Sequence, residues 1–296
     1  MSLKLWEASK KTKKKSELFA FEKFISKKLN KKFQNDYKKI HEWSVKNSPD
    51  FWNIFWEFSK VKGFKSKIKI KKSKIFYKNA FLPQSKLNFG ENLLSKNNKE
   101  KALTFISENG FREMRNWNEL NQNVSKILKF LKEIKIKKKD RVVAYMPNTI
   151  ETVESFIASV SLGAIWSSCS PDFGTKGVVE RFSQINPKVI FVANEYFYNG
   201  KKINILERIP EIIKQIPSIK YIVVTNYPGQ KKIIKKPKAN KVKVKFWSEL
   251  MRANSSNIIF SKFDFEHELA ILFSSGTTGK PKCICHRNGG VLLQHK

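Results

Sequence analysis

The chain has 296 residues, of which 41% are hydrophobic and 13% aromatic, a composition typical of a folded globular protein and not of a disordered one. Its formal net charge of +34 suggests binding to nucleic acid or to a membrane surface, but lysine outnumbers arginine 52 to 7, whereas recognition of phosphates and bases favours arginine. The charge is therefore attributed to the coding bias of an AT-rich genome, and we expect from it only non-specific binding of polyanions at low salt.

Cysteine usage and the absence of a long apolar run indicate the expected compartment. Three cysteines, Cys169, Cys283 and Cys285, are too few for a disulfide framework in a chain of this length. No signal peptide is recognised at the start, and no apolar run approaches the roughly 20 residues that cross a membrane. A reducing, cytoplasmic location is therefore expected.

The N-terminal part of the chain is basic and rich in aromatic residues. Residues 1–40 carry many lysines and an apolar set that predicts one amphipathic helix: Leu18, Phe19, Phe21, Phe24 and Ile25. Further aromatic residues follow at helical spacings between residues 41 and 58: Trp43, Phe51, Trp52, Phe55, Trp56 and Phe58. These rings could stack on nucleic-acid bases, but packing against a larger body is the favoured interpretation. Residues 61–79 are strongly basic and are expected to form a connector or a solvated edge.

From about residue 115 the sequence alternates between helix and strand patterns. Asn116 and Glu119 have the spacing of a capping box, and the helix that they begin is expected to bury Leu120, Val124, Ile127, Leu128 and Leu131. Apolar runs predict strands at 141–145, 165–168, 189–192 and 221–225, and helices are expected around 153–163, 177–184 and 203–215. This alternation predicts an α/β fold with a mainly parallel sheet, in which ligands bind at the carboxyl ends of the strands.

The most informative string is Ser274-Ser275-Gly276-Thr277-Thr278-Gly279-Lys280-Pro281-Lys282, which directly follows the apolar run 269–273. Glycines permit tight turns that bring backbone N–H groups close to an anion, hydroxyls donate further hydrogen bonds, and Lys282 adds positive charge. These residue types together predict a phosphate-binding loop, although clusters of Ser, Thr and Gly also form plain solvated loops. The string is not a Walker loop, because Ser274 occupies the first glycine position and Pro281 follows the lysine.

Other reactive side chains carry weaker signals. The string CICH at 283–286 lacks a second ligand pair for zinc, so these residues are expected to be buried or half-buried in a strand. Cys169 has no evident partner histidine and is expected to be structural. Asp172 is a candidate substrate anchor, with a role in a turn equally compatible. His267 and Glu268 are expected at the surface.

The string 274–282 resembles the phosphate-loop signature of the adenylate-forming enzymes, a superfamily of acyl-CoA synthetases, luciferases and peptide-synthetase adenylation domains. Residues 140–149 resemble a strand and turn in the large domain of these enzymes. The string WSSCSPDFG at 166–174 is more specific and is similar to the acetoacetyl-CoA synthetases (acetoacetate–CoA ligases). Further strings agree with that branch: Leu5-Trp6-Glu7, the aromatic cluster, residues 87–94 and residues 286–293.

The resemblance covers essentially the whole chain and implies a fold. It implies an N-terminal helical cap followed by part of the large multi-sheet α/β domain of adenylate-forming enzymes. Residues 1–95 are assigned to the cap region, with an aromatic helical segment at 37–60, and residues 96–296 to the first part of the AMP-binding (adenylation) domain. The family's ribose-binding aspartate, hinge and small C-terminal domain are expected beyond Lys296, so an incomplete sequence is favoured over a truncated product. No complete turnover is expected from these 296 residues alone.

The resemblance also implies an activity: ATP, acetoacetate and CoA give acetoacetyl-CoA, AMP and pyrophosphate. It assigns phosphate binding to Ser274, Ser275, Gly276, Thr277, Thr278, Gly279 and Lys282, with Thr277 and Lys282 as the catalytic residues. Mg²⁺ is expected to arrive with the nucleotide, since it prefers phosphate oxygens and water to an all-protein cage, and no protein metal site is expected. Asn199-Gly200-Lys201 resembles a Gly-Gly-Lys turn that touches CoA, but Asn199 replaces the first glycine, and a plain basic turn is an equal alternative.

Three alternatives stay open. The first is an enzyme of the same class that acts on acetate, propionate or another short acid, as in acetyl-CoA or propionyl-CoA synthetases. The second is a basic protein that binds nucleic acid or another polyanion through its lysines and aromatic rings. The third is a catalytically inactive fragment that still binds phosphate. Small-molecule substrates are the expected partners, with no specific nucleic acid and no membrane.

Overall fold

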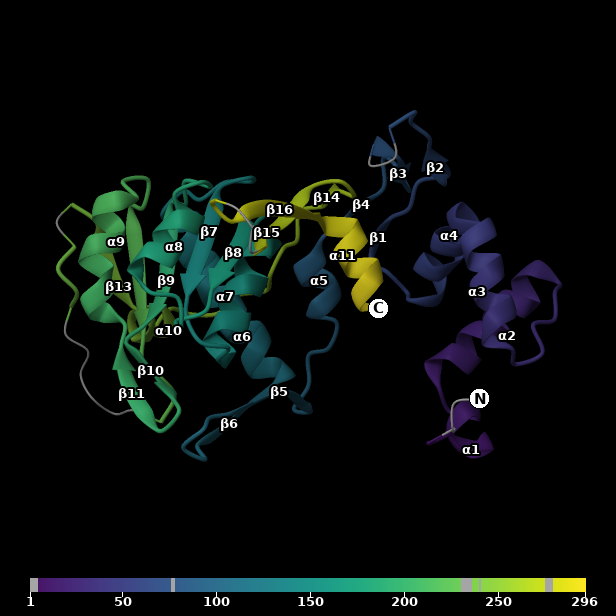
Figure 1. The fold of residues 1–296 in the computed structure, drawn as a ribbon, viewed down its shortest axis with the longest axis horizontal. Helices are drawn as coiled ribbons and strands as arrows, with labels where there is room; N and C mark the ends of the chain where they lie inside the picture. Colours follow the sequence, from purple (N-terminus) through teal and green to yellow (C-terminus); the bar gives the residue numbers. More distant parts are fainter. Residues whose placement is uncertain (1–4, 76–77, 230–235, 240, 275–278) are drawn as a thin grey trace. The chain divides into compact units, whose positions relative to one another are not determined.

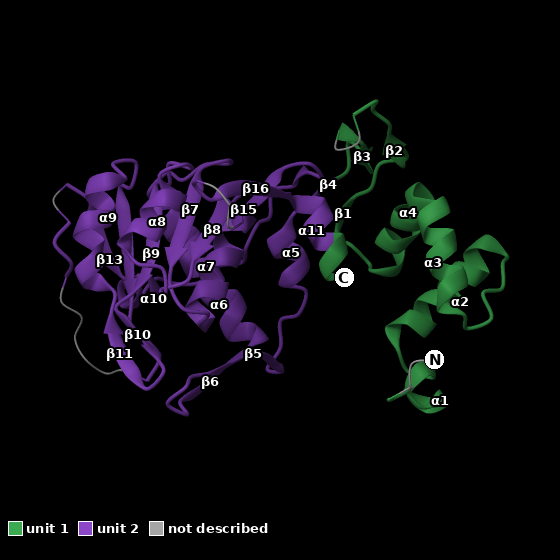
Figure 2. Cartoon of the chain, in the orientation of Figure 1, with its two compact units in different colours: residues 1–85, 293–296 green, residues 86–292 purple. Residues whose placement is uncertain are grey.

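The computed structural model describes residues 5–75, 78–229, 236–239, 241–274 and 279–296, and Figure 1 shows it as a ribbon. The chain divides into two compact units, one of residues 1–85 and 293–296 and the other of residues 86–292 (Figure 2). Within the described ranges, every helix is too short or too polar to cross a bilayer.

The N-terminal unit is mainly helical. Its elements are α1 (Lys10–Lys14), α2 (Glu17–Leu29), α3 (Tyr37–Lys46), α4 (Ser48–Phe58), β1 (Gly63–Phe64), β2 (Ile70–Lys71) and β3 (Ala80–Phe81). The predicted amphipathic helix is confirmed as α2. The aromatic segment expected at 37–60 consists of two helices, because Pro49 lies in the first turn of α4, where its fixed φ favours a new helix start.

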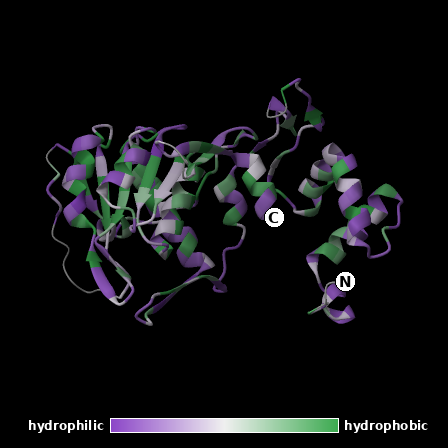
Figure 3. Cartoon of the chain, viewed as in Figure 1, coloured by the Kyte–Doolittle hydropathy of each residue, from purple (hydrophilic) through white to green (hydrophobic). Residues whose placement is uncertain are grey.

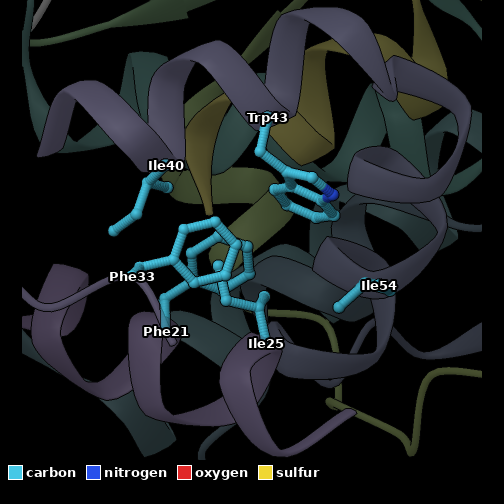
Figure 4. Close-up of a cluster of buried hydrophobic side chains, with 6 residues drawn as sticks. All are labelled: Phe21, Ile25, Phe33, Ile40, Trp43 and Ile54. Carbon is cyan, nitrogen blue, oxygen red and sulfur yellow. The ribbon is translucent and has the colours of Figure 1, made fainter. Parts of the chain in front are cut away.

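The aromatic residues of this unit form a core. Six side chains from α2, α3, α4 and the connection after α2 are buried together (Figure 4): Phe21, Ile25, Phe33, Ile40, Trp43 and Ile54. The ring centroid of Phe21 lies 5.8, 5.5 and 5.1 Å from those of Phe51, Phe55 and Phe58, with the rings edge to face, the arrangement that aromatic quadrupoles favour. The rings therefore pack on one another and on α2 within this unit, and packing against a larger body stays a prediction.

The second unit contains the α/β domain. Its first elements are β4 (Lys86–Leu87), α5 (Phe89–Leu93), β5 (Lys101–Ile106), β6 (Arg112–Asn116), α6 (Trp117–Glu133), β7 (Arg141–Tyr145), α7 (Ile150–Ser161), β8 (Ile165–Cys169), α8 (Thr175–Phe182) and β9 (Val189–Ala193). There follow β10 (Glu195–Tyr198), β11 (Lys201–Asn204), the 3₁₀ turn η2 (Leu206–Arg208), α9 (Ile209–Gln215), β12 (Tyr221–Thr225), β13 (Lys243–Phe246), α10 (Trp247–Met251), β14 (Phe263–Asp264), β15 (Glu268–Ser274), β16 (Lys282–Arg287) and α11 (Asn288–His295). The division between the units falls within α11, after residue 292.

A mainly parallel sheet forms the centre of this unit. In the part of the chain that the structure describes, seven strands follow the order β13-β12-β9-β7-β8-β15-β16, and β16 alone runs antiparallel to its neighbour. Every residue of β9 is buried, and hydrophobic colour follows the central strands in Figure 3, as expected for strands covered on both faces. The predicted strands and the α/β class are confirmed.

The strand order reverses between β7 and β8. The chain passes from β7 to β8 on one side and then returns past β7 to reach β9. Right-handed crossovers place α7 and α8 on opposite faces, consistent with the packing of α7 on α6 and of α8 on α9. The carboxyl ends of β7 and β8 are thus a topological switch point, where open α/β sheets bind ligands.

Helix α6 begins at the predicted capping box. Asn116 Oδ1 accepts a hydrogen bond from the Glu119 backbone N–H at 2.9 Å, and Glu119 Oε2 accepts one from the Asn116 backbone N–H at 2.9 Å. These bonds satisfy two of the orphan N–H groups at the helix start. The five apolar positions predicted to face inward are buried: Leu120, Val124, Ile127, Leu128 and Leu131.

The helix predicted over 203–215 is wrong in its first part. Residues 201–204 form β11, which pairs antiparallel with β10, and the helix α9 begins only at Ile209. Asn199 and Gly200 have φ values of 49° and 70°, both in the left-handed region that a two-residue type I′ hairpin turn requires. The Asn-Gly pair therefore specifies a hairpin, and this local signal prevails over the apolar periodicity that suggested a longer helix.

His267 is buried, so the expectation that it lies at the surface is wrong. Its Nε2 atom lies 3.0 Å from the backbone oxygen of Gly163, and its ring stacks on Phe263 at a centroid distance of 5.0 Å. Burial lowers the pKa of the imidazole, because water no longer stabilises the charged form. The imidazole thus joins the segment before β15 to the connection between α7 and β8.

Gly163 provides a stability test of this connection. Its φ is +81°, and an ideal Cβ would lie 2.5 Å from Cζ of Phe263. We expect Gly163→Ala to lower the free energy of unfolding by about 2–5 kcal/mol, from left-handed strain and overpacking. Gly110 also has a positive φ, of +79°, but nothing lies within 4 Å of its Cβ position.

Gly110→Ala is therefore the matched control, with the same strain and no clash. Urea unfolding of both variants separates the two contributions, and Gly110→Ala is expected to lose only about 1–2 kcal/mol. Equal losses of unfolding free energy in the two variants would show that the Phe263 ring moves aside for the added methyl group. That result would contradict tight packing of Phe263 against Gly163.

Candidate active site

The predicted phosphate loop joins β15 to β16 at the carboxyl edge of the sheet, meaning the edge formed by the carboxyl ends of its parallel strands. β15 runs parallel to β8, and the β15–β16 ladder closes with Ser274 opposite Lys282. The prediction that the loop lies at the carboxyl ends of the strands is confirmed for these two flanking positions. Ser275, Gly276, Thr277 and Thr278 lie outside the described residues.

The described residues of the loop have properties that suit an anion. Gly279 has a φ of +92° and nothing within 4 Å of a Cβ position, so a side chain there would meet left-handed strain. Lys282 is exposed as the first residue of β16, and it forms no ion pair with another residue in the described ranges. Its ammonium is therefore available to a ligand at this edge.

Two side chains that the sequence analysis did not single out fix the surroundings of the loop. Gln184, just after α8, donates from Nε2 to the backbone oxygen of Pro281 at 3.0 Å. Ser167 on β8 donates from Oγ to the backbone oxygen of Ile271 on β15 at 2.7 Å. The first contact holds the end of the loop against the α8 side, and the second joins the two strands that lead to the site.

Tyr145 and Arg208 hold the segment 170–174, which follows β8 at the switch point. The Tyr145 hydroxyl donates to the backbone oxygen of Phe173 at 2.6 Å, and Arg208 Nη1 donates to the Tyr145 hydroxyl at 2.6 Å and to the backbone oxygen of Pro171 at 3.0 Å. Burial raises the pKa of Tyr145, an effect that the hydrogen bond from Arg208 partly offsets. These bonds fix the backbone beside the phosphate loop.

Sequence reasoning missed this pair because its partners are far apart along the chain. Tyr145 ends β7, and Arg208 lies in the 3₁₀ turn before α9, 63 residues later. The available signal was the position of Tyr145 at the end of a predicted strand, directly before Met146-Pro147, where a polar group faces the carboxyl edge.

Asp172 takes part in a local turn. Its Oδ2 atom accepts a hydrogen bond from Ser170 Oγ at 2.7 Å, and its side chain is exposed. Arg181 stacks over the neighbouring Phe173 ring at 3.9 Å and donates to the backbone oxygen of Gly177 at 2.8 Å. Of the two roles considered for Asp172, the contacts support the turn.

The candidate CoA contacts lie at the tip of the β10–β11 hairpin. Asn199 and Gly200 form its turn, all three residues of the candidate are exposed, and Lys201 pairs with Tyr198 in the ladder. Lys202 forms an ion pair with Glu195 at 2.8 Å. The hairpin by itself explains the Asn-Gly sequence, so any contact with CoA is a further role for an already required turn.

In the described part of the chain, the surroundings of the three cysteines favour neither a nucleophile nor a metal site. Cys169 is buried, and burial raises the pKa of its thiol to about 12, which opposes formation of a thiolate. Residues 283–286 lie in a strand as predicted, but Cys283 and Cys285 are exposed, so the expected burial is wrong. Among the strands that the structure describes, β16 lies at the edge of the sheet, which leaves these side chains uncovered. In the described ranges, no three His, Cys, Asp or Glu side chains are grouped to hold a metal ion.

Comparison with known proteins shows which class of protein carries this α/β sheet and its glycine- and hydroxyl-rich sequence. The family model described as AMP-binding enzyme matches residues 94–295. The chain therefore belongs to the AMP-binding enzyme family, and the resemblance to adenylate-forming enzymes is confirmed.

Two relatives and one solved structure show which branch of the family this chain resembles. The acetoacetyl-CoA synthetase of Macaca fascicularis is 37% identical over 270 residues, which cover 88% of this chain and 40% of the relative. The acetoacetyl-coenzyme A synthetase of Rhizobium meliloti is 37% identical over 291 residues, covering 98% of this chain and 44% of the relative. The structure of an acetoacetyl-CoA synthetase from Streptomyces lividans matches with a TM-score of 0.90 and 25% identity, over 99% of this chain and 45% of that one.

These matches confirm the resemblance to the acetoacetyl-CoA synthetase branch. They also show that the chain spans less than half the length of each of these relatives.

Proposed function

We propose that this chain is the N-terminal part of an AMP-forming acid–thiol ligase that converts acetoacetate, ATP and CoA into acetoacetyl-CoA, AMP and pyrophosphate. The observation that carries the proposal is the pairing of Ser274 with Lys282 at the end of β15, beside the switch point, because these two residues flank a sequence of glycines and hydroxyls. The choice of acetoacetate rests on the relatives named above. The assignment of residues 1–95 to a cap and of 96–296 to the adenylation domain is part of the same proposal.

The chemistry requires activation of a poor electrophile. The carboxylate of the acid attacks the α-phosphorus of ATP, the bond to the β-phosphate oxygen breaks, and pyrophosphate leaves. The CoA thiolate then attacks the carbonyl carbon of the acyl-adenylate and displaces AMP. Because both nucleophiles belong to substrates, the protein has to position them and stabilise negative charge on phosphate.

The loop supplies that stabilisation. Seven residues would surround the β- and γ-phosphates, which become pyrophosphate: Ser274, Ser275, Gly276, Thr277, Thr278, Gly279 and Lys282. Thr277 and Lys282 are the proposed catalytic residues, with a hydroxyl and an ammonium directed at the leaving group. Mg²⁺ would be held by the nucleotide phosphates and neutralise their charge. Asn199, Gly200 and Lys201 are proposed to contact CoA.

The ligase proposed here and the alternative short-chain ligases differ in the acid that they activate. Thioester formation by the gene product that contains this chain, measured by mass spectrometry, distinguishes acetoacetate from acetate and propionate. We expect acetoacetate to be preferred at least about tenfold in kcat/KM, because a pocket that hydrogen-bonds the 3-oxo group rejects acids without it. A preference for acetate or propionate would assign the chain to the alternative substrate.

An assay of the 296 residues alone tests whether they contain the complete catalytic machinery. We expect them to bind MgATP but to form no acetoacetyl-CoA. Thioester formation by this chain alone would contradict the proposal that it is an incomplete part of the ligase.

A further inference from the structure

A pocket outside the α/β domain has a lining suited to a ligand that is charged at one end and apolar along its length. It lies in the N-terminal unit between α1, the first turns of α2 and the start of α3, with a volume of about 470 Å³. Pockets for small molecules have volumes of roughly 300–1,000 Å³. None of the described residues of the loop, 274 and 279–282, contributes to its lining.

The inner surface of this pocket is apolar. Leu18 and Phe19 line it from α2, and Tyr37 and Ile40 from α3. Ile40 is buried, whereas Leu18 is 45% and Tyr37 62% exposed, so apolar surface remains open to solvent in a concave place. Removal of this apolar surface from water favours the binding of an apolar ligand.

The rim on the α1 side is cationic. Lys10, Lys13 and Lys14 all line the pocket, and their spacing of i, i+3 and i+4 places them on one face of α1. Lys13 forms an ion pair with Glu7, whereas Lys10 and Lys14 form none with residues in the described part of the chain. Lysine is abundant throughout this sequence, but α1 gathers these three beside an apolar concavity.

One carboxylate also lines the pocket, and it is already engaged. Glu22 Oε1 accepts a hydrogen bond from the backbone N–H of Asn35 at 2.7 Å. The Lys23 ammonium lies 4.6 Å from the centroid of the Phe19 ring, which adds a further positive charge beside the wall. The balance of charge at the pocket is positive and suits an anionic headgroup.

We propose that this pocket binds a fatty-acid carboxylate of medium chain length. The carboxylate pairs with Lys10 and Lys14, and the alkyl chain lies along Leu18, Phe19 and Tyr37 toward Ile40. A concave site with a localised cationic rim suits one such molecule, whereas a bilayer surface needs a convex or flat apolar face. The site is separate from the proposed ligase chemistry and does not depend on it.

Calorimetric titration of the 296-residue protein with laurate, below its micelle-forming concentration, tests the proposal. We expect saturable binding of one laurate per chain. The double substitution K10A/K14A is expected to weaken it at least about tenfold, the loss of charge-assisted contacts. K71A/K72A is the matched control, because it removes two exposed lysines of the same unit outside the pocket lining, and it should bind laurate like the unaltered protein.

A second variant tests the apolar part. Leu18→Gln keeps the charge of the protein but replaces an apolar lining residue, and it should also weaken laurate binding while circular dichroism shows unchanged helix content. Equal losses in K10A/K14A and K71A/K72A would overturn the proposal in favour of non-specific attraction. So would retention of laurate affinity in Leu18→Gln, or binding to anionic vesicles of phosphatidylserine without any binding of monomeric laurate.

Discussion

Replacement of Lys282 by alanine is expected to weaken MgATP binding by about ten- to a hundredfold. A hydrogen bond between an ammonium and a phosphate contributes roughly 1.5–3 kcal/mol, and each 1.4 kcal/mol corresponds to about a factor of ten in affinity. Lys282 is exposed at the start of β16, opposite Ser274, and forms no ion pair with the residues that the structure describes. Isothermal calorimetry of the 296-residue protein with MgATP measures the loss.

Lys132→Ala is the control for net charge. Lys132 is exposed near the end of α6, so its loss removes the same charge without touching the loop, and the affinity for MgATP should hardly change. If both variants bind equally weakly, and the affinity of the unaltered protein falls steeply with salt, the nucleotide is held by diffuse lysine charge. The polyanion-binding alternative would then replace the ligase proposal.

Replacement of Glu154 by glutamine is expected to remove a large pH dependence of stability. Glu154 on α7 is fully buried, Oε1 accepts from Asn123 Nδ2 at 2.9 Å and from Arg115 Nε at 3.3 Å, and Oε2 has no hydrogen-bond partner. Burial raises the pKa of this carboxyl to about 8, because the charged form loses its hydration and the nearby guanidinium compensates only in part.

Proton linkage gives the direction in which the free energy of unfolding changes with pH. Between pH 4.5, the ordinary pKa of the carboxyl, and about 8, the folded state holds a proton that the unfolded state releases. The free energy of unfolding therefore falls by roughly 1.4 kcal/mol for each pH unit in that window. The glutamine variant lacks this contribution, so its stability relative to the unaltered protein should rise by about 3 kcal/mol between pH 5.5 and 8.

Urea unfolding at these two pH values measures the difference. Glu133→Gln is the control, since Glu133 is exposed on α6, and it should follow the unaltered protein at both values. A stability difference between Glu154→Gln and the unaltered protein that does not change with pH would mean that the ion pair with Arg115 keeps the carboxyl charged throughout.

The parts of the fold that could be predicted are those specified by short-range patterns. The strands β7, β9 and β12 are nearly continuous apolar runs, and α6 begins with a capping box whose residues are three apart. Their burial between layers follows from hydrophobicity alone. The position of the phosphate loop could be inferred for the same reason, because it directly follows an apolar run in a parallel sheet.

The failures have specific physical causes. The Asn199-Gly200 pair imposes a hairpin turn, which outweighs the weak helical periodicity of residues 203–208. His267 is buried through a contact with Gly163, and Arg208 reaches Tyr145 across 63 positions of sequence. Such contacts depend on tertiary packing that no local pattern encodes. Burial of Cys283 and Cys285 was overestimated because no local pattern shows that β16 lies at the edge of the described sheet.

Hydrogen–deuterium exchange of the 296-residue protein with and without MgATP shows where on the chain the nucleotide binds. We expect added protection in peptides that span β15, the loop and β16, and in the neighbouring segment 170–174. We expect no added protection in the lysine-rich helix α1. Protection spread over the basic surface, or an unchanged exchange rate across residues 268–287, would contradict the assignment of nucleotide binding to this loop.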